Sequence, residues 1–385
     1  MTRFSEEQLA MRDAVRELAD ERIAPRAAEI DEKAEWPSDI VELLAQHDVL
    51  AIPFPEEHGG LGGDLLTLCL AIEEVSRVCA TSGLIIALQE LGATPLLLAG
   101  TEEQKQRWIP DLAAGRMLAA FALTESAAGS NASDVRTRAV RDGDDWVLNG
   151  EKRFISQGDV AGVVAVFAAT DTSDEAVSRK RHMTCFYVEK ETPGFSAPRL
   201  EHKMGIRGSP TAELAFDNVR IPDANRVGEV GEGWRLVMKT FERSRAGIAA
   251  QAVGISQGAL EVATAYARER EQFGKPIGEH QMVGAMLADM ATRTEATRQL
   301  LWAACERIQA GDGHAARWAS MAKLFCGDTA MAVTTDAVQV LGGYGYITEY
   351  PVERMMRDAK ITQLYEGTQQ IQRLIVARDQ LATER

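Results

Sequence analysis

The sequence is poor in the residues that build disulfide bridges and metal sites. Its 385 residues include only five cysteines and six histidines. The cysteines are odd in number and widely spread, none belongs to a Cys-X-X-Cys pair, and no two histidines have the spacing of metal ligands. We therefore expect no disulfide bridge, zinc site or iron–sulfur cluster, and we predict that the thiols are free and buried.

The sequence also lacks an excess of positive charge and long apolar runs. The net charge is −15, which argues against nucleic acid or an anionic membrane as a partner. No apolar run approaches the roughly 20 residues of a membrane span, and residues 1–7 resemble neither a signal peptide nor a transit peptide. With 45% hydrophobic and 26% charged residues, the composition is that of a soluble globular protein, which we expect to be cytoplasmic.

A dinucleotide-binding fingerprint is missing as well. Residues 59–63 read Gly-Gly-Leu-Gly-Gly, but they follow no predicted strand and lack the last glycine of the Gly-X-Gly-X-X-Gly spacing. We interpret this stretch as a flexible connector.

Hydrophobic periodicity divides the chain into three predicted domains, because 385 residues are too many for one compact core. Residues 1–116 are predicted to be helical. Residues 117–226 contain short runs rich in β-forming residues and a hairpin signal at 142–145, which predict antiparallel strands. Residues 227–385 are again helical, with long alanine-rich stretches that suit a bundle. These stretches cover residues 246–268, 281–310 and 315–341.

Two of the predicted helix starts carry a capping box. Ser5 is followed three residues later by Gln8, and Thr101 by Gln104. In each pair the hydroxyl and the amide side chain satisfy free backbone N–H groups of the first turn. The helix that begins after Thr101 is expected to stop at Pro110, because proline removes a backbone donor.

Residues 364–373 read Leu-Tyr-Glu-Gly-Thr-Gln-Gln-Ile-Gln-Arg and place Glu366 just before an apparent final helix. Taken alone, a glutamate before glycine is most simply an exposed carboxylate at a helix start. The sequence upstream adds QVLGG at 339–343, TEYP at 348–351 and DAKI at 358–361. Together these motifs resemble the C-terminal region of the acyl-CoA dehydrogenases, flavoenzymes that desaturate acyl thioesters.

In that family the glutamate of the YEG motif removes the α-proton of the substrate, so the resemblance assigns the role of base to Glu366. It also implies that Tyr365 and Gly367 contact the substrate, and that Thr368 and Gln370 contact the flavin.

Residues 241–245 support this assignment of the base. Relatives for isovaleryl and long-chain substrates carry the catalytic glutamate on this helix, where the present chain has Ser244. The resemblance further implies that Glu242 and Arg245 shape the CoA-side entrance of the site. A surface salt pair between Glu242 and a nearby arginine is the alternative.

Residues 121–130, FALTESAAGS, resemble the flavin signature TEPGAGSD. The resemblance implies that Ser130 meets a phosphate of the cofactor or of CoA. The chain departs from the signature at Ser126, Ala127 and Asn131, and the lost proline and glycine predict a less constrained loop. The residues of this stretch that are expected to bind the flavin are Phe121, Leu123, Thr124, Gly129 and Ser130.

Residues 149–156, NGEKRFIS, resemble a second family signature, NGxKxWIT. There the aromatic residue covers the flavin and the hydroxyl bonds near flavin N5, roles that fall here to Phe154 and Ser156. Without the family context, Phe154 is as well explained as a core aromatic at a strand end.

Residues 270–277, REQFGKPI, resemble the family's RxxFGxPI turn. The planar fork of an arginine suits a pyrophosphate because it donates two parallel hydrogen bonds. In the family these residues reach the flavin nucleotide of a neighbouring subunit, which implies an obligate homo-oligomer, expected to be a tetramer. The residues assigned to this contact are Arg270, Gln272, Phe273, Gln281, Gln339, Val340, Gly342 and Gly343.

The resemblance covers nearly the whole chain in the same motif order. It implies an α+β, mostly α fold with an N-terminal helical domain, a central β domain and a C-terminal four-helix bundle, and FAD as cofactor. The expected product is a trans-2-enoyl-CoA, with electrons passing to an electron-transferring flavoprotein. The alternatives are a related flavin oxidase or hydroxylase, a dehydrogenase for acyl groups on a carrier protein, and a DNA-binding relative, against which the charge argues.

Residues 84–91 match family residues that line the far end of the acyl pocket. They include Leu84 and Leu88 and contain no arginine or lysine, so an acyl group with a second carboxylate would be left unpaired. We expect short, branched or medium acyl groups and rejection of glutaryl-type substrates. Alternatively, these leucines only face the helix core.

Overall fold

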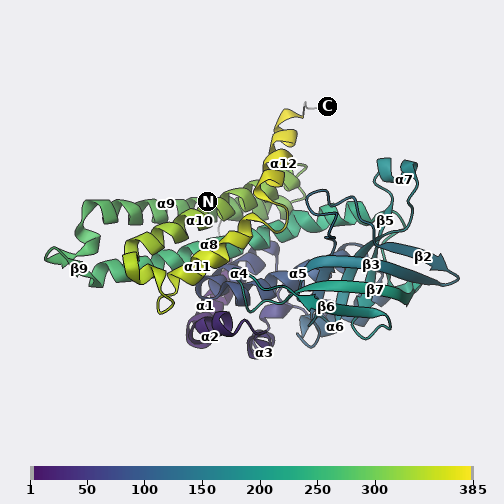
Figure 1. Ribbon diagram of the computed structural model, residues 1–385, viewed down its shortest axis with the longest axis horizontal. Coiled ribbons are helices and arrows are strands. Elements are labelled where there is room, and N and C mark those ends of the chain that lie inside the picture. The colour runs from purple at the N-terminus through teal and green to yellow at the C-terminus, as the bar shows by residue number, and fades with distance from the viewer. Residues whose placement is uncertain (1–3, 383–385) are drawn as a thin grey trace.

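The computed structural model describes residues 4–382 and has three parts in chain order. Helices come first, a twisted sheet follows, and long helices then run away from the sheet (Figure 1). This arrangement confirms the predicted fold class, mostly α with a central β part. All five cysteines are free and buried, as predicted.

The N-terminal part is built from six helices, and both predicted capping boxes are present. The expected stop at Pro110 is wrong, because the last of these helices continues to Ala113. Leu112 and Ala113 are buried, and their packing outweighs the one hydrogen bond that proline removes. The helices are α1 (Glu6–Leu18), α2 (Ala27–Lys33), α3 (Ser38–Gln46), α4 (Leu65–Val78), α5 (Ala80–Ala99) and α6 (Glu102–Ala113).

Helix α5 corrects the expectation about apolar runs. It has 20 residues with a mean hydropathy of 1.5 in its most apolar window, enough by length and composition to cross a membrane. The structure buries 83% of that window, and α5 packs against α4 and two elements from later in the chain, the first strand and the first long C-terminal helix. Its side chains therefore form part of the protein core.

Residues 59–63 are an ordered turn, so the interpretation as a flexible connector is wrong. The backbone N–H groups of Leu61 and Gly63 donate to the carbonyls of Ala51 and Ile52 at 3.0 and 2.8 Å. A Cβ atom at Gly60 would lie 2.1 Å from the carbonyl oxygen of Phe54. The glycines are needed because two backbone segments touch here.

The sheet has eight strands in the order β6-β7-β3-β2-β4-β5-β8, with β1 added beside β4. The hairpin at 142–145 is confirmed by the pairing of Asp142 with Asp145. Not all strands are antiparallel, because β1 pairs in parallel with β4. The strands are β1 (Ala119–Ala122), β2 (Arg138–Asp142), β3 (Asp145–Ser156), β4 (Val163–Ala169), β5 (Met183–Glu189), β6 (Phe195–Leu200), β7 (Thr211–Pro222) and β8 (Arg226–Val227), with α7 (Asp174–Ser178) between β4 and β5.

The C-terminal part is a helical bundle in which α8, α9 and α10 pack together while α11 and α12 pack on α10. The predicted alanine-rich helices are confirmed, although the first begins earlier than expected. The elements are α8 (Gly233–Glu269), α9 (Gln281–Gln309), α10 (Ala315–Leu341), α11 (Val352–Ala359) and α12 (Gln369–Leu381), with a hairpin of β9 (Glu271–Gln272) and β10 (Lys275–Pro276) between α8 and α9.

Helix α8 lies very close to α4 because glycines face the contact. Cβ atoms at Gly254 and Gly258 would lie 2.3 and 1.9 Å from the carbonyl oxygens of Glu73 and Arg77. Any larger residue at either position would push the two helices apart.

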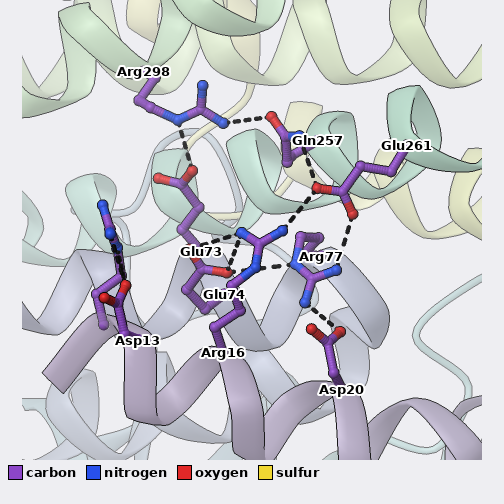
Figure 2. A network of polar contacts seen from close by, with 10 residues as sticks. Asp13, Arg16, Asp20, Glu73, Glu74, Arg77, Gln257, Glu261 and Arg298 are labelled. Atoms are coloured by element: carbon purple, nitrogen blue, oxygen red, sulfur yellow. Dashed lines mark hydrogen bonds and ion pairs between the residues drawn. The ribbon is translucent and has the colours of Figure 1, made fainter. Parts of the chain in front are cut away.

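A network of charged side chains joins the N-terminal helices to the bundle (Figure 2). Arg77 of α4 contacts Glu261 of α8 at 2.9 Å and also pairs with Asp20. Glu73 of α4 accepts from Arg298 of α9 at 2.8 Å. Burial raises the pKa of the Glu73 carboxyl, and the charge of Arg298 opposes that rise.

Replacing Arg298 should therefore loosen α4 from α9. The change Arg298→Met leaves the Glu73 carboxylate buried without its cation, and we expect a loss of about 3 kcal/mol in the free energy of unfolding. Urea denaturation followed by circular dichroism measures this loss. Arg179→Met, which breaks the exposed pair with Glu175, is the control and should leave the midpoint unchanged. Equal midpoints for Arg298→Met and wild type would contradict the importance of this pair.

Candidate active site

Glu366 lies in a turn between α11 and α12. Its backbone is left-handed, with φ of +55°, and Gly367 follows with φ of +90°. A left-handed glutamate is strained and persists only where the surrounding structure enforces it. Thr368 then caps α12, its hydroxyl accepting a bond from the N–H of Ile371 at 3.4 Å. The carboxylate therefore stands in front of the final helix, as the sequence indicated.

Side chains from three helices hold this turn. Nε of Arg245 on α8 donates to the carbonyl of Glu366 at 3.2 Å. Nε2 of Gln372 on α12 donates to the carbonyls of Glu366 and Gly367 at 3.0 and 2.9 Å. Nζ of Lys323 on α10 donates to the Gly367 carbonyl at 2.7 Å. The carbonyls of the turn are thus fixed by donors that surround it.

The carboxylate of Glu366 is itself bound by Ser244, whose hydroxyl donates to Oε2 at 2.6 Å. Burial is the largest effect on this carboxyl and raises its pKa, while the Ser244 hydrogen bond and the charges of Arg245 and Lys323 oppose that rise. The net shift is upward. A carboxyl with a raised pKa is a better base than a solvated one at neutral pH.

The other residues near Glu366 differ in part from expectation. Arg245 is buried, with its guanidinium 5.3 Å from the ring centroid of Phe241, and it supports the turn of Glu366. Its role at a CoA-side entrance stays a prediction. Glu242 pairs with Lys239 at 2.8 Å, not with an arginine. The hydroxyl of Tyr365 bonds to the side chain of Gln251 on α8.

The two predicted flavin loops are tied together by a buried ion pair. Nζ of Lys152 contacts Oε1 of Glu125 at 2.7 Å and the carbonyl of Leu123 at 3.0 Å. The N–H of Arg153 donates to the carbonyl of Thr124 at 2.8 Å. Burial lowers the pKa of Lys152 to about 8, although Glu125 opposes that shift. Residues 121–130 and 149–156 thus form one rigid platform.

The surface of this platform suits a planar ligand. Phe154 has φ of +57° and a side chain that is 60% exposed, so it is not a core aromatic. Gly129 and Ser130 are exposed and Ser156 is half-buried. Ser126, which departs from the family signature, donates to Glu151 at 2.6 Å and so restrains the loop that we expected to be loose.

Phe121 and Phe241 connect the platform to the turn of Glu366. The ring centroids of Phe121 on β1 and Phe241 on α8 lie 5.7 Å apart. Phe241 in turn contacts Arg245, which bonds to Glu366. A continuous series of contacts therefore links the candidate base to the candidate flavin platform.

Thr368 and Gln370, which are also predicted flavin contacts, lie at the start of α12 beside Glu366. Most of the residues assigned to the flavin of a neighbouring subunit line a separate cavity of about 720 Å³ at the far end of α8. Figure 1 shows the β9 hairpin at one end of the molecule and the sheet at the other. A 37-residue helix is about 55 Å long, far beyond the reach of one cofactor. Gln281 and Gln339 are not among the lining residues, but the other predicted residues are: Arg270, Gln272, Phe273, Val340, Gly342 and Gly343.

Three residue sets with clear contacts were not assigned from the sequence. These are Ser244, Lys323 and the Glu125–Lys152 pair. A lysine in the otherwise uncharged run 318–327 of an alanine-rich helix was the available signal for Lys323, and opposite charges within the two flavin signatures were the signal for the pair.

Family models cover the chain almost completely. Residues 5–116 match the acyl-CoA dehydrogenase N-terminal domain, residues 120–219 the middle domain and residues 231–381 the C-terminal domain. The chain belongs to the acyl-CoA dehydrogenase family. It is accordingly an FAD-dependent oxidoreductase that acts on acyl-CoA. Within residues 4–382, no cluster of histidine, cysteine, aspartate or glutamate side chains could hold a metal ion.

An acyl-CoA dehydrogenase of Bacillus subtilis is 46% identical over 97% of this chain and 98% of its own. A chain in a structure of the electron transferring flavoprotein of Acidaminococcus fermentans has a TM-score of 0.96 and 43% identity, covering 100% of both chains. Butyryl-CoA dehydrogenase of Megasphaera elsdenii has a TM-score of 0.95 and 38% identity over 99% of this chain and 100% of its own. A prolyl acyl carrier protein oxidase has a TM-score of 0.93 and 32% identity over 99% and 100%.

Proposed function

We propose that this protein removes the α-proton and a β-hydride of an acyl-CoA thioester, giving the trans-2-enoyl-CoA, with Glu366 as the base. The observation that carries this proposal is the geometry at Glu366. A carboxylate with a raised pKa is held in a left-handed turn by three helices and is connected through Phe241 to the platform for a planar ligand.

The turn also suits the activation of the thioester. An α-proton is too weakly acidic for a carboxylate unless the thioester carbonyl accepts hydrogen bonds. Within residues 4–382 the backbone N–H of Glu366 donates no hydrogen bond. The carbonyls of Glu366 and Gly367 already accept hydrogen bonds from the side chains that hold the turn. We assign this N–H to the thioester carbonyl. Bound FAD supplies the hydride acceptor, and Thr124, Phe154 and Ser156 hold its ring.

The site is complete only in an oligomer in this proposal, with a tetramer as the expected form. The sheet, which carries the platform, and the β9 hairpin, which borders the distal cavity, lie at opposite ends of the molecule (Figure 1), so one FAD can contact both groups only if they come from different subunits. Phe273 at the hairpin tip is 95% exposed, and Leu374 and Leu381 on the projecting helix α12 are also exposed. Such apolar groups favour burial against a second copy.

The electron acceptor in this proposal is an electron-transferring flavoprotein. The structure from Acidaminococcus fermentans, whose matching chain is 43% identical to this one, is described as one of such a flavoprotein. The dehydrogenase would release electrons to it one at a time. An oxidase would instead pass them to dioxygen, and we expect little reaction with dioxygen here.

The acyl group is proposed to be short, branched or of medium length. Leu84 and Leu88 are buried, and the relative from Megasphaera elsdenii is named for butyryl-CoA. An arginine does approach this region, since Nε of Arg243 contacts Oε1 of Glu90 at 3.2 Å. Glu90 is buried and already forms an ion pair with Arg243. A second carboxylate on the substrate would therefore be repelled by the negative charge of Glu90.

The change Glu366→Gln should abolish the base but keep the shape of the turn. We expect kcat to fall by at least about 10²–10⁴-fold, with FAD still bound and KM little changed. Dye reduction with butyryl-CoA measures turnover, and flavin absorbance measures retention. Glu42→Gln on the exposed face of α3 is the control. A Glu366→Gln enzyme with more than about a tenth of wild-type kcat would overturn the assignment.

The change Arg270→Ala should weaken FAD binding, and more strongly as the protein is diluted, because the site needs two subunits. Flavin release by ultrafiltration, combined with sedimentation at several concentrations, measures both effects. Arg268→Ala, two residues earlier on the exposed surface of α8, should behave like wild type. If a monomer held FAD as tightly as the oligomer, the shared site would be ruled out.

Substrate range tests the proposed acyl pocket. Comparing kcat/KM for butyryl-, isobutyryl-, octanoyl- and hexadecanoyl-CoA should place the maximum at eight carbons or fewer, because in this proposal Leu84 and Leu88 close the far end of the acyl pocket. Glutaryl-CoA should be turned over poorly, since its free carboxylate would face Glu90. A maximum at sixteen carbons, or rapid oxidation of glutaryl-CoA, would contradict this assignment. The same assays with dioxygen as sole acceptor separate an oxidase from a dehydrogenase.

A further inference from the structure

Lys323 is a fully buried lysine directly behind the turn of Glu366. It lies on α10, and its side chain has no exposed area. Nζ donates to the carbonyl of Gly367 at 2.7 Å and to Oε1 of Gln369 at 3.0 Å. Lysines are rarely buried without a carboxylate partner, and none of the ion pairs within residues 4–382 includes Lys323. Its charge is therefore balanced by these two oxygens and by the nearby carboxylates of Glu366 and Asp328.

The partner Gln369 makes this position specific. Its Nε2 donates to the carbonyl of Leu324 at 2.7 Å and to Asp328 at 3.0 Å, both on α10. The amide is therefore oriented with its oxygen toward Lys323. Because the buried ammonium group of Lys323 bonds to two oxygens, it fixes the distance between the turn and α10.

We propose that Lys323 is a positioning residue for the base: its ammonium group anchors the Gly367 carbonyl, holds the left-handed turn and stabilises the carboxylate form of Glu366. This inference rests on the proposed function, since it assumes that Glu366 is the base. Lys323 touches neither the carboxylate nor the reacting atoms in the structure and takes no part in proton transfer.

The charges around Lys323 support this role. Burial lowers the pKa of Lys323 to about 7; Glu366 and Asp328 oppose the shift, and Arg245 adds to it. The positive charge of Lys323 in turn lowers the pKa of Glu366, whereas burial raises it. The two groups are therefore linked: Lys323 is charged on the acid side of neutrality, where the Glu366 carboxylate most needs stabilisation against protonation.

Three substitutions separate the charge of Lys323 from its hydrogen bond. Lys323→Met removes both, Lys323→Gln keeps a donor without charge, and Lys323→Arg keeps the charge. Lys360→Met is the control, because Lys360 bonds only to the side chain of Gln363. Each variant is purified with FAD, and kcat, KM and the pH profile of kcat are measured with butyryl-CoA.

We expect Lys323→Met to lower kcat by about 10- to 100-fold, with KM little changed. The acid limb of its pH profile should move up by about one unit, because Glu366 loses a nearby positive charge. Lys323→Gln should recover part of kcat and keep the shifted limb, whereas Lys323→Arg should restore the position of the limb. Acid limbs of Lys323→Met and Lys323→Gln that coincide with that of wild type would overturn the proposal. If the Met variant fails to fold, Lys323→Gln decides by the same criterion.

A stability measurement tests the buried charge without activity. The pKa of Lys323 is about 7 in the folded protein and its ordinary value is 10.5, so the unfolded chain binds more protons between these values. Tm of wild type relative to Lys323→Gln should therefore rise as pH rises from 7 to 10. Activity in Glu366→Gln would instead refute the proposed base, whatever Lys323 does.

Discussion

The close packing of α8 on α4 fixes the position of nearly everything else in the site. Gly254 and Gly258 let the backbones of the two helices touch, so α8 has little freedom to slide or rotate. The same helix carries Ser244 and Arg245 to Glu366 in its first half and ends at Glu269, just before Arg270 beside the distal cavity. A small shift of α8 would move the support of the base and the second half of the cofactor site together.

The electrostatics of the site follow from burying several charges around one turn. Burial raises the pKa of the Glu366 carboxyl, and the charges of Arg245 and Lys323 oppose that rise. Both cations bond to backbone carbonyls and leave the carboxylate oxygens to Ser244. A direct salt bridge would have lowered the basicity of Glu366 much further. The two cations thus limit the rise in the pKa of Glu366 without pairing directly with its carboxylate.

Much of the fold was predictable because its signals are local. The capping boxes at Ser5 and Thr101 and the alanine-rich helices depend only on neighbouring residues. The errors at Pro110 and in the direction of β1 have a common cause. Each is decided by a partner far along the chain, such as the buried surface under Leu112 or β4 beside β1. The turn at 59–63 is instead held by the nearby residues Ala51, Ile52 and Phe54. Sequence patterns contain no direct information about such partners.

The residues of the site likewise divide into those that a local motif predicts and those that depend on distant contacts. Glu366 and Phe154 lie within recognisable motifs, although only the structure shows the left-handed backbone at both. Lys323 and Ser244 reach Glu366 or Gly367 across 44 and 122 positions of sequence. No spacing rule predicts a contact between helices at such separations. The supports of the base therefore became visible only when α8, α10 and α12 were placed in space.

The burial of α5 has a consequence for synthesis of the protein. This helix has the hydropathy of a membrane segment, and one of its covering elements, α8, follows only after the whole sheet has been made. At about 5–20 residues per second, a nascent chain would expose this apolar surface for on the order of ten seconds. During that interval the segment is a ready substrate for chaperones and for aggregation, and the finished enzyme retains no trace of the hazard.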